Sequence, residues 1–314
     1  MGRGEVAQPH TEATGVLTRA GETPAGAGRP YLLVFAAVTC WALTGIVFAV
    51  VLRSVTISPL TVVLLRGLTA TALLGAYLAL FRRDGLRVAR RDLPQLALLG
   101  LVYVTVFYPA LIYTYELNSV PVGTALLYLF PAFVTLASAR WFGEALTRRK
   151  LLALALCLLG TLVVVAPWRT GAQVSPLGVL LGVLSAAAYA YYAVFSRPLL
   201  RRYHFTTVLF YTLGIGCLGL LPAQYFVGSA LPDPRTLLTI ALAVGVLVTL
   251  LPLSLYTIAL SRLPAGNVAI AATIEPALTI IFAALLLGQY LAPIQLLGAA
   301  LIVGGVVVLA SGGR

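Results

Sequence analysis

A chain of 314 residues that is 61% hydrophobic and only 10% charged carries more apolar surface than a soluble core of this length can bury. This composition excludes an ordinary soluble domain and indicates an integral membrane protein. The net charge of +12 does not indicate nucleic-acid binding, because the basic residues lie in short breaks between apolar runs and not on a polar domain. The cysteines lie inside apolar runs, at spacings that indicate neither a metal site nor a disulfide framework: Cys40, Cys157 and Cys217.

Residues 1–29 are rich in Gly, Ala, Thr and Pro and carry both signs of charge. They lack the basic start and the apolar core that define a signal peptide. We therefore expect them to form a flexible tail on the cytosolic side of a membrane.

From Pro30 onward the chain falls into apolar segments of the length that a tilted helix needs to cross about 30 Å of hydrocarbon. The sequence does not show the short segments of alternating polar and apolar residues that are typical of membrane barrels. The predicted fold is all-α, with ten transmembrane helices in two sets of five. The first set is predicted at 31–52, 60–81, 94–115, 120–141 and 150–167, and the second at 176–197, 205–227, 236–260, 265–287 and 292–311.

The two sets are copies of each other, which predicts one five-helix repeat at 30–167 and a second at 176–311. Five residues of the first copy recur at one fixed offset: Pro109, Tyr113, Leu117, Pro121 and Gly123 return as Pro252, Tyr256, Leu260, Pro264 and Gly266. After a two-residue insertion, Pro131, Gly143, Leu146 and Gly160 return as Pro276, Gly288, Leu291 and Gly305.

Lysine and arginine in short loops predict the orientation, since such loops remain in the cytosol. With the N-terminus inside, seventeen of the 21 basic residues fall on the cytosolic side and three, Arg53, Arg169 and Arg235, fall outside, while Arg66 lies within a span. Both termini are therefore predicted to be cytosolic in the cytoplasmic membrane. Because five crossings is an odd number, the second copy would enter from the opposite side, and such inverted repeats are typical of transporters.

The pattern resembles the ten-helix members of the drug/metabolite transporter superfamily, which contain two EamA domains. The resemblance runs from Leu32 to Ala310 and is carried by Trp41-Ala-Leu-Thr-Gly, by Ser58-Pro-Leu-Thr followed by Arg66, by Val120-Pro-Val-Gly-Thr through Pro131 to Gly143-Glu144-Ala-Leu, and by Leu263-Pro-Ala-Gly-Asn through Glu275-Pro276 to Gly288-Gln289. Members of such families mostly export amino acids, drugs or other small metabolites. The chain departs from the family at Gln289, where an acidic residue is common, and in the shorter first copy between Gly123 and Pro131.

Two ionisable residues, Arg66 and Glu275, lie well inside predicted spans. On insertion scales, placing such a charge at the centre of a membrane helix costs roughly 2.5 to 3.5 kcal/mol. Counted at about 1.5 Å per residue, their depths in the membrane differ by about 6 Å, which is within side-chain reach. They are candidates for substrate binding or proton coupling in a central cavity. A buried salt bridge that only fixes helix packing is the alternative. Phe130 stands at the position equivalent to Glu275.

Four prolines are predicted to interrupt helices: Pro131, Pro276, Pro109 and Pro252. Proline lacks an N–H, so Pro131 and Pro276 would free carbonyls near Leu127 and Ala272, as a polar site within the membrane requires. The alternative is that these prolines only kink their helices and have no part in a binding site. One turn beyond Pro109 and Pro252 lie Tyr113 and Tyr256, which we include among the candidate binding residues.

Trp41 is predicted near the middle of its span, away from the interfaces that tryptophan usually prefers. A central indole could stack on a substrate, and ordinary packing explains it as well. The other aromatic candidates are Tyr108, Tyr128, Tyr189 and Tyr192.

No catalytic constellation, phosphate-binding loop or ATP-binding module is recognisable, so no catalytic residue, metal site or cofactor is predicted. The chain is interpreted as a secondary transporter, most simply an exporter of a small metabolite, amino acid or drug-like compound, that works by alternating access. The predicted partners are the lipid bilayer, a small-molecule substrate and, as a candidate coupling ion, the proton, with the oligomeric state left open. Import, a membrane enzyme and a non-transporting scaffold are the alternatives.

Overall fold

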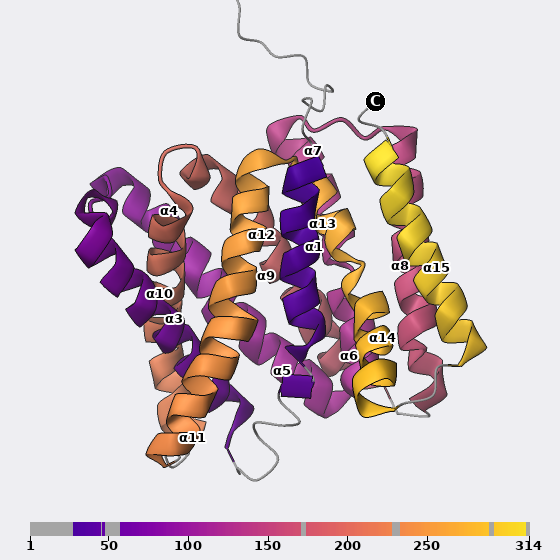
Figure 1. Ribbon diagram of the computed structural model, residues 1–314, viewed down its shortest axis with the longest axis horizontal. Helices are drawn as coiled ribbons and strands as arrows, with labels where there is room; N and C mark the ends of the chain where they lie inside the picture. The colour runs from indigo at the N-terminus through magenta and orange to yellow at the C-terminus, as the bar shows by residue number, and fades with distance from the viewer. Residues whose placement is uncertain are drawn as a thin grey trace, which may run out of the picture.

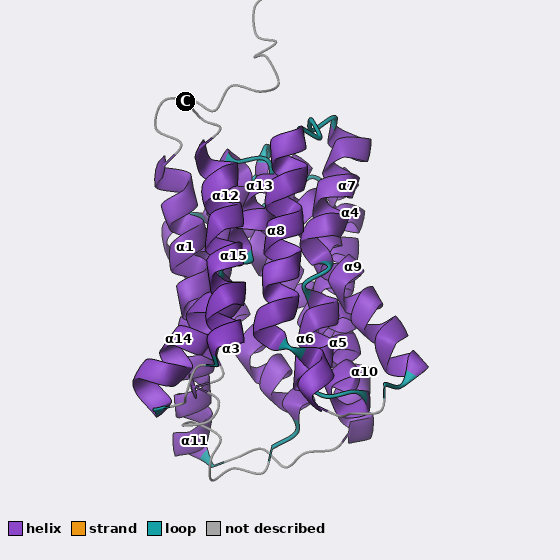
Figure 2. Ribbon diagram, turned by 90° about the vertical axis from the view of Figure 1, so that its right-hand side faces the viewer, coloured by secondary structure: helices purple, strands orange, loops and turns teal. Residues whose placement is uncertain are grey.

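The computed structural model describes residues 28–44, 46–47, 57–170, 174–227, 233–288 and 292–311, and these ranges contain helices and turns but no strand (Figures 1 and 2). The all-helical class predicted from the sequence is confirmed for them. Most of the predicted tail, together with Arg53, Gln289 and Leu291, lies outside the described residues.

The helices of the first half are α1 (Gly28–Ala42), α3 (Pro59–Phe81), α4 (Leu93–Gly100), α5 (Phe107–Leu117), α6 (Val120–Leu127), α7 (Phe130–Phe142) and α8 (Arg148–Val165). Those of the second half are α9 (Pro176–Leu200), α10 (Phe205–Val227), α11 (Pro234–Thr239), α12 (Leu251–Arg262), α13 (Ala265–Ala272), α14 (Glu275–Leu287) and α15 (Pro293–Ala310). A π-helical segment joins α4 to α5 at Leu101–Val106, and another joins α11 to α12 at Ile240–Leu250.

In the described part of the chain, eight continuous helical stretches are long and apolar enough to cross a membrane. They correspond to the predicted spans other than 31–52 and 150–167. The shorter apolar helix α1 covers part of the former, and α8 covers most of the latter with 18 residues that begin with Arg148, Arg149 and Lys150. The length and composition of these stretches are those of helices that span a membrane.

The two halves use the same local devices to begin and end helices. Pro109 and Pro252 each follow a π-helical segment, whose wider i to i+5 hydrogen bonds accommodate a residue without an N–H. Gly143 and Gly288 end α7 and α14 in the left-handed region at φ +65°, where a residue with a Cβ would be strained.

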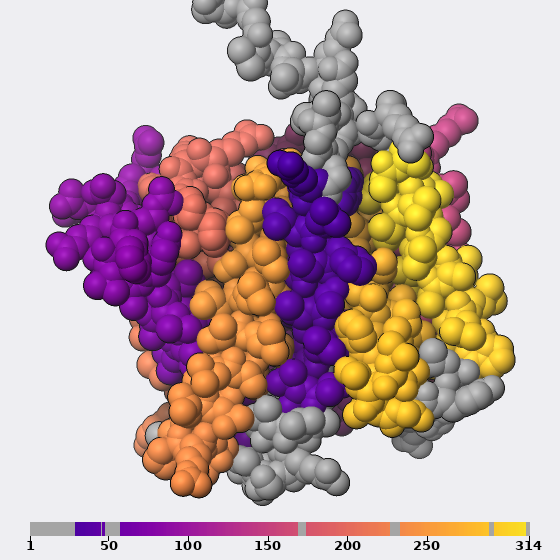
Figure 3. Space-filling model, viewed as in Figure 1, coloured from indigo at the N-terminus to yellow at the C-terminus, as the bar shows by residue number. Residues whose placement is uncertain are grey.

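Helices of one half pack on helices of the other. α9 lies against α5, α6 and α7, while α1 lies against α12, α13 and α14. Figure 3 shows α1 at the surface between α12 and α14. We name the group of α4, α5, α6, α7 and α9 the first bundle, and the group of α1, α11, α12, α13 and α14 the second bundle. The pairs α3 with α10 and α8 with α15 lie at the two edges (Figure 1).

The two bundles meet at one end of the molecule. There α7 packs along α13, near the start of α1 and the end of α15, and we call this the termini end (Figure 1). At the other end, the corresponding helices α6 and α14 make at most marginal contact. Among the described residues, the bundles therefore pack together at the termini end through α7 and α13, and the equivalent pair at the opposite end is apart.

Candidate functional site

A cavity of about 140 Å³ lies between the bundles. Most of its wall is aromatic, and it includes both ionisable residues that the sequence places inside spans. The lining residues are Trp41, Thr44, Arg66, Tyr103, Phe107, Tyr108, Leu127, Tyr128, Phe130, Tyr189, Val248, Ala272 and Glu275.

Two helix interruptions border this cavity. α6 ends at Leu127 and α7 begins at Phe130, while α13 ends at Ala272 and α14 begins at Glu275. All four of these residues line the cavity. Helix ends leave backbone groups without intrahelical partners, so both interruptions bring polar backbone to a site within the membrane-spanning helices. Pro131 and Pro276 lie in the first turns of α7 and α14.

Glu275 is the first residue of α14, where the positive end of the helix dipole favours a carboxylate. Tyr128, whose side chain is buried, interacts through its hydroxyl with the Glu275 carboxyl. Phe130 begins α7 at the equivalent place and faces the same cavity. Only one of the two equivalent positions therefore supplies charge.

Arg66 projects into the cavity from α3. Its guanidinium carbon lies 4.3 Å from the centre of the Tyr108 ring, which is a cation–π contact. Among the described residues, ion pairs within 4.0 Å involve only Glu144 and Asp92 as acids. Arg66 and Glu275 thus face one cavity without forming a direct ion pair, and both remain available to a ligand in this conformation.

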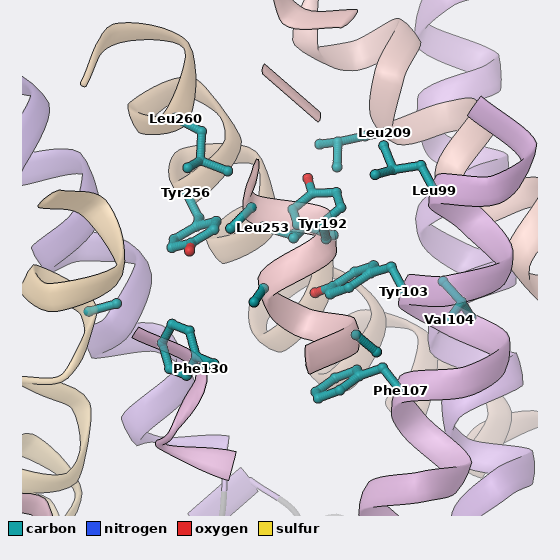
Figure 4. Packing of buried hydrophobic residues seen from close by; sticks show 14 of the residues in the cluster. Leu99, Tyr103, Val104, Phe107, Phe130, Tyr192, Leu209, Leu253, Tyr256 and Leu260 are labelled. Carbon is teal, nitrogen blue, oxygen red and sulfur yellow. The ribbon is translucent and has the colours of Figure 1, made fainter. Parts of the chain in front are cut away.

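Aromatic rings form the wall towards the termini end, and Figure 4 shows three of them: Tyr103, Tyr192 and Tyr256. Tyr103 stacks on Tyr192, with ring centres 4.2 Å apart, and Tyr192 shares a hydrogen bond of 2.6 Å with the Thr257 hydroxyl. Trp41 packs against Tyr256 with ring centres 5.4 Å apart. Tyr103, Tyr192 and Tyr256 are buried, so this layer closes the cavity on that side.

The structure brings together six of the predicted candidates as cavity lining: Trp41, Arg66, Tyr108, Tyr128, Tyr189 and Glu275. Tyr256 does not line the cavity but packs against Trp41, and its buried hydroxyl interacts with Tyr189.

Tyr113 lies elsewhere, on a face of α5 where 49% of its surface is exposed. It is 5 residues beyond Tyr108, and at about 100° per residue the two side chains point to different sides of the helix. Sequence reasoning did not single out Tyr103 and Phe107. Their spacing of four residues, which places them on one helix face, was the available signal.

Within the described residues, no cluster of His, Cys, Asp and Glu could hold a metal ion. A cavity that combines two ionisable side chains, Arg66 and Glu275, with an aromatic wall suits recognition of a small molecule by charge and by aromatic contact.

Comparisons with known proteins give the family of the chain and its fold. The model of the EamA-like transporter family matches residues 28–166 and again residues 176–311. An uncharacterized transporter of Archaeoglobus fulgidus is 30% identical over 68% of this chain and 76% of its own length. A probable amino-acid metabolite efflux pump of Salmonella typhimurium is 28% identical over 73% of this chain and 90% of its own. A solved crystal structure superposes with a TM-score of 0.78 at 20% identity, over 91% of this chain and 98% of that one, which shows a shared fold.

Proposed function

Because the chain belongs to the EamA-like transporter family, we propose that it is a secondary transporter that exports a small metabolite of the amino-acid or drug-like class across the cytoplasmic membrane. The observation that carries this proposal is the cavity between the bundles, which holds Arg66 and Glu275 on an aromatic wall. Family membership identifies a membrane transporter of small molecules. The substrate class, direction and mechanism are the proposed part.

The charges of the cavity favour a substrate that carries both signs. Arg66 offers a planar fork of donors that fits a carboxylate, and Glu275 offers an acceptor for an ammonium group. The surrounding rings would take up an apolar side chain. The efflux pump from Salmonella, named for an amino-acid metabolite, supports this class.

The size of the cavity suits a compact substrate. About 140 Å³ lies below the range of roughly 300–1,000 Å³ that is typical of pockets for drug-sized ligands. A small amino-acid-like molecule fits this conformation most readily, and a larger compound requires the bundles to move apart.

We further propose ten crossings as two inverted repeats, with both termini cytosolic. Packing of α8 on α15 supports the inverted relationship. Gly160 lies against Gly298 and Ile302, while the equivalent Gly305 lies against Ala153 and Cys157. These are the same contacts with the two copies exchanged, as an approximate two-fold axis between antiparallel helices requires.

Alternating access would follow from rocking the two bundles about the cavity. Closure at the termini end and separation at the opposite end correspond to one of the two states that such a cycle needs. Import by the same carrier is the alternative, since the imposed gradient sets the net direction of a secondary transporter.

Counterflow into proteoliposomes tests the function. Vesicles that contain the purified protein are loaded with one unlabelled compound from a panel of zwitterionic, anionic, cationic and neutral metabolites, and uptake of the same compound in labelled form is followed. We expect counterflow for zwitterions, and less of it with Arg66→Ala. Absence of counterflow for every compound, with the protein folded and inserted, would overturn the proposal.

A further inference from the structure

Glu144 joins parts of both bundles at the termini end, beyond the cavity and outside the candidate site. One carboxylate oxygen accepts from Arg197 of α9 at 2.7 Å and from the backbone N–H of Ala265 at 2.9 Å. The other accepts from the Lys150 ammonium at 2.9 Å and from the N–H of Gly266 at 3.3 Å. A single carboxylate thus connects the turn after α7, the start of α8, α9 and the first turn of α13.

These contacts are shielded from water. The side chains of Glu144, Lys150 and Arg197 are 9%, 6% and 19% exposed. A charge pair that is partly removed from water is screened little by salt. The contact is also close, since a Cβ on Gly266 would lie 2.5 Å from the Lys150 nitrogen. The residue that recurs as glycine in both copies therefore leaves room for the ammonium here.

The link crosses the boundary between the bundles. Glu144 follows α7 and Arg197 belongs to α9, both of the first bundle, whereas Ala265 and Gly266 begin α13 of the second. α7 and α13 are the helices whose packing closes the termini end. Opening this end requires α13 to leave α7, and the carboxylate then loses its two backbone donors.

The second copy has no comparable charges. The residues at the positions equivalent to Glu144 and Lys150 are Gln289 and Gln295, both neutral. Of these, Gln295 accepts an N–H from Ala292 within its own helix end. The charged pair of Glu144 and Lys150 at the termini end therefore has no charged equivalent in the second copy, which makes the two copies chemically different at these positions.

We propose that Glu144 is a gating residue: its carboxylate holds the termini end closed, and its release from α13 is a step of opening at that end. The proposal rests on the proposed alternating-access function. It assigns to Glu144 control over the population of the two states and no contact with the substrate.

The test measures the distance between the bundles without substrate. Spin labels are placed at Arg140→Cys on α7 and Ser261→Cys on α12, two exposed positions outside the Glu144 contacts, after Cys40, Cys157 and Cys217 are replaced by alanine. Pulsed electron paramagnetic resonance then gives the distance distribution in lipid nanodiscs. Glu144→Gln is compared with its parent, and Glu144→Asp, which retains the charge, serves as the conservative variant.

Asp92→Asn is the matched control. Asp92 also pairs with an arginine at this end, Arg202 at 2.6 Å, and accepts from the Tyr203 hydroxyl at 2.7 Å. Its partners lie in the turn after α9, which belongs to the same bundle as α4. Its loss should therefore leave the distance between the bundles unchanged.

We expect Glu144→Gln to increase the population at long distance about tenfold, within the range of typical allosteric couplings. Glu144→Asp should fall between Glu144→Gln and the parent, and Asp92→Asn should match the parent. Equal distributions for Glu144→Gln and the parent, or an equal change in Asp92→Asn, would overturn the gating role. Counterflow is measured on the same variants. A distance change without any transport would support the gating role of Glu144 and contradict the transport function. Transport without a distance change would support the transport function and contradict the gating role.

Discussion

Gly160 of α8 and Gly298 of α15 face each other so closely that a Cβ on either would meet backbone of the other. The distance would be 2.7 Å from a Cβ on Gly160 to the Gly298 carbonyl oxygen, and 2.8 Å from a Cβ on Gly298 to the Gly160 carbonyl oxygen. Backbone cannot move aside as a flexible side chain can. The pairing of α8 with α15 thus depends on two residues without side chains, as is common between membrane helices.

Gly160→Ala and Gly298→Ala should each lower stability by about 1–3 kcal/mol, the usual cost of overpacking. Thermal unfolding in a mild detergent measures the change. Gly304→Ala on α15 is the control, because a Cβ there meets nothing within 4 Å, and it should be near neutral. An equal loss for Gly304→Ala would contradict the role of the contact, because alanine has the higher helix propensity and meets nothing at that position.

Arg66→Lys should fold normally and transport less, because an ammonium lacks the planar fork that a guanidinium offers a carboxylate. Arg66→Ala should reduce transport further. Initial rates in proteoliposomes at equal protein content give the comparison. Tyr108→Phe keeps the ring beneath Arg66 and should change the rate little. Normal transport by Arg66→Ala would reduce this residue to helix packing.

Two tyrosines of the predicted site should behave differently. Tyr128→Phe removes the hydroxyl that interacts with Glu275 and should lower transport at least severalfold, at roughly 1 kcal/mol per lost hydrogen bond. Tyr113→Phe changes a half-exposed residue away from the cavity and should have no effect. Initial transport rates of the two variants give the comparison. A lower rate for Tyr128→Phe alone would assign substrate binding to the cavity, and a lower rate for Tyr113→Phe alone would assign it to the turn after Pro109.

Reporter fusions test the proposed orientation. Fusions after Arg314 and within Arg82–Asp92 should report the cytosol, and fusions within 227–235 should report the outside. An external signal from the C-terminal fusion, together with a cytosolic signal from the fusion within Arg82–Asp92, would contradict the even number of crossings between them and, with it, the inverted repeat.

Most of the helical framework could be predicted from the sequence, because apolar length and turn residues are local properties. Eight predicted spans coincide with helical stretches of suitable length and composition. The position of Arg66 and Glu275 in one cavity could also be predicted, because their calculated depths in the membrane are similar and charged residues in lipid favour a shared polar site.

Properties that depend on which helices are neighbours could not be predicted. Tyr113 and Tyr256 occupy equivalent positions, yet one is 49% exposed and the other is buried, because α1 packs on α12 and covers that side. Glu144 had no significance in the sequence beyond a family motif. Its partners Arg197 and Ala265 are far away along the chain, so only the packed structure reveals the link.

Glu275→Gln gives the most direct measurement of the central claim, that a charged cavity between the bundles carries the substrate. Glutamine keeps the size and hydrogen bonding of the side chain and removes its ionisation. We predict a protein that inserts and folds like the wild type, with counterflow of a zwitterion greatly reduced and its dependence on pH lost. Counterflow at the wild-type rate, with the wild-type response to pH, would contradict the account and make Glu275 a structural residue.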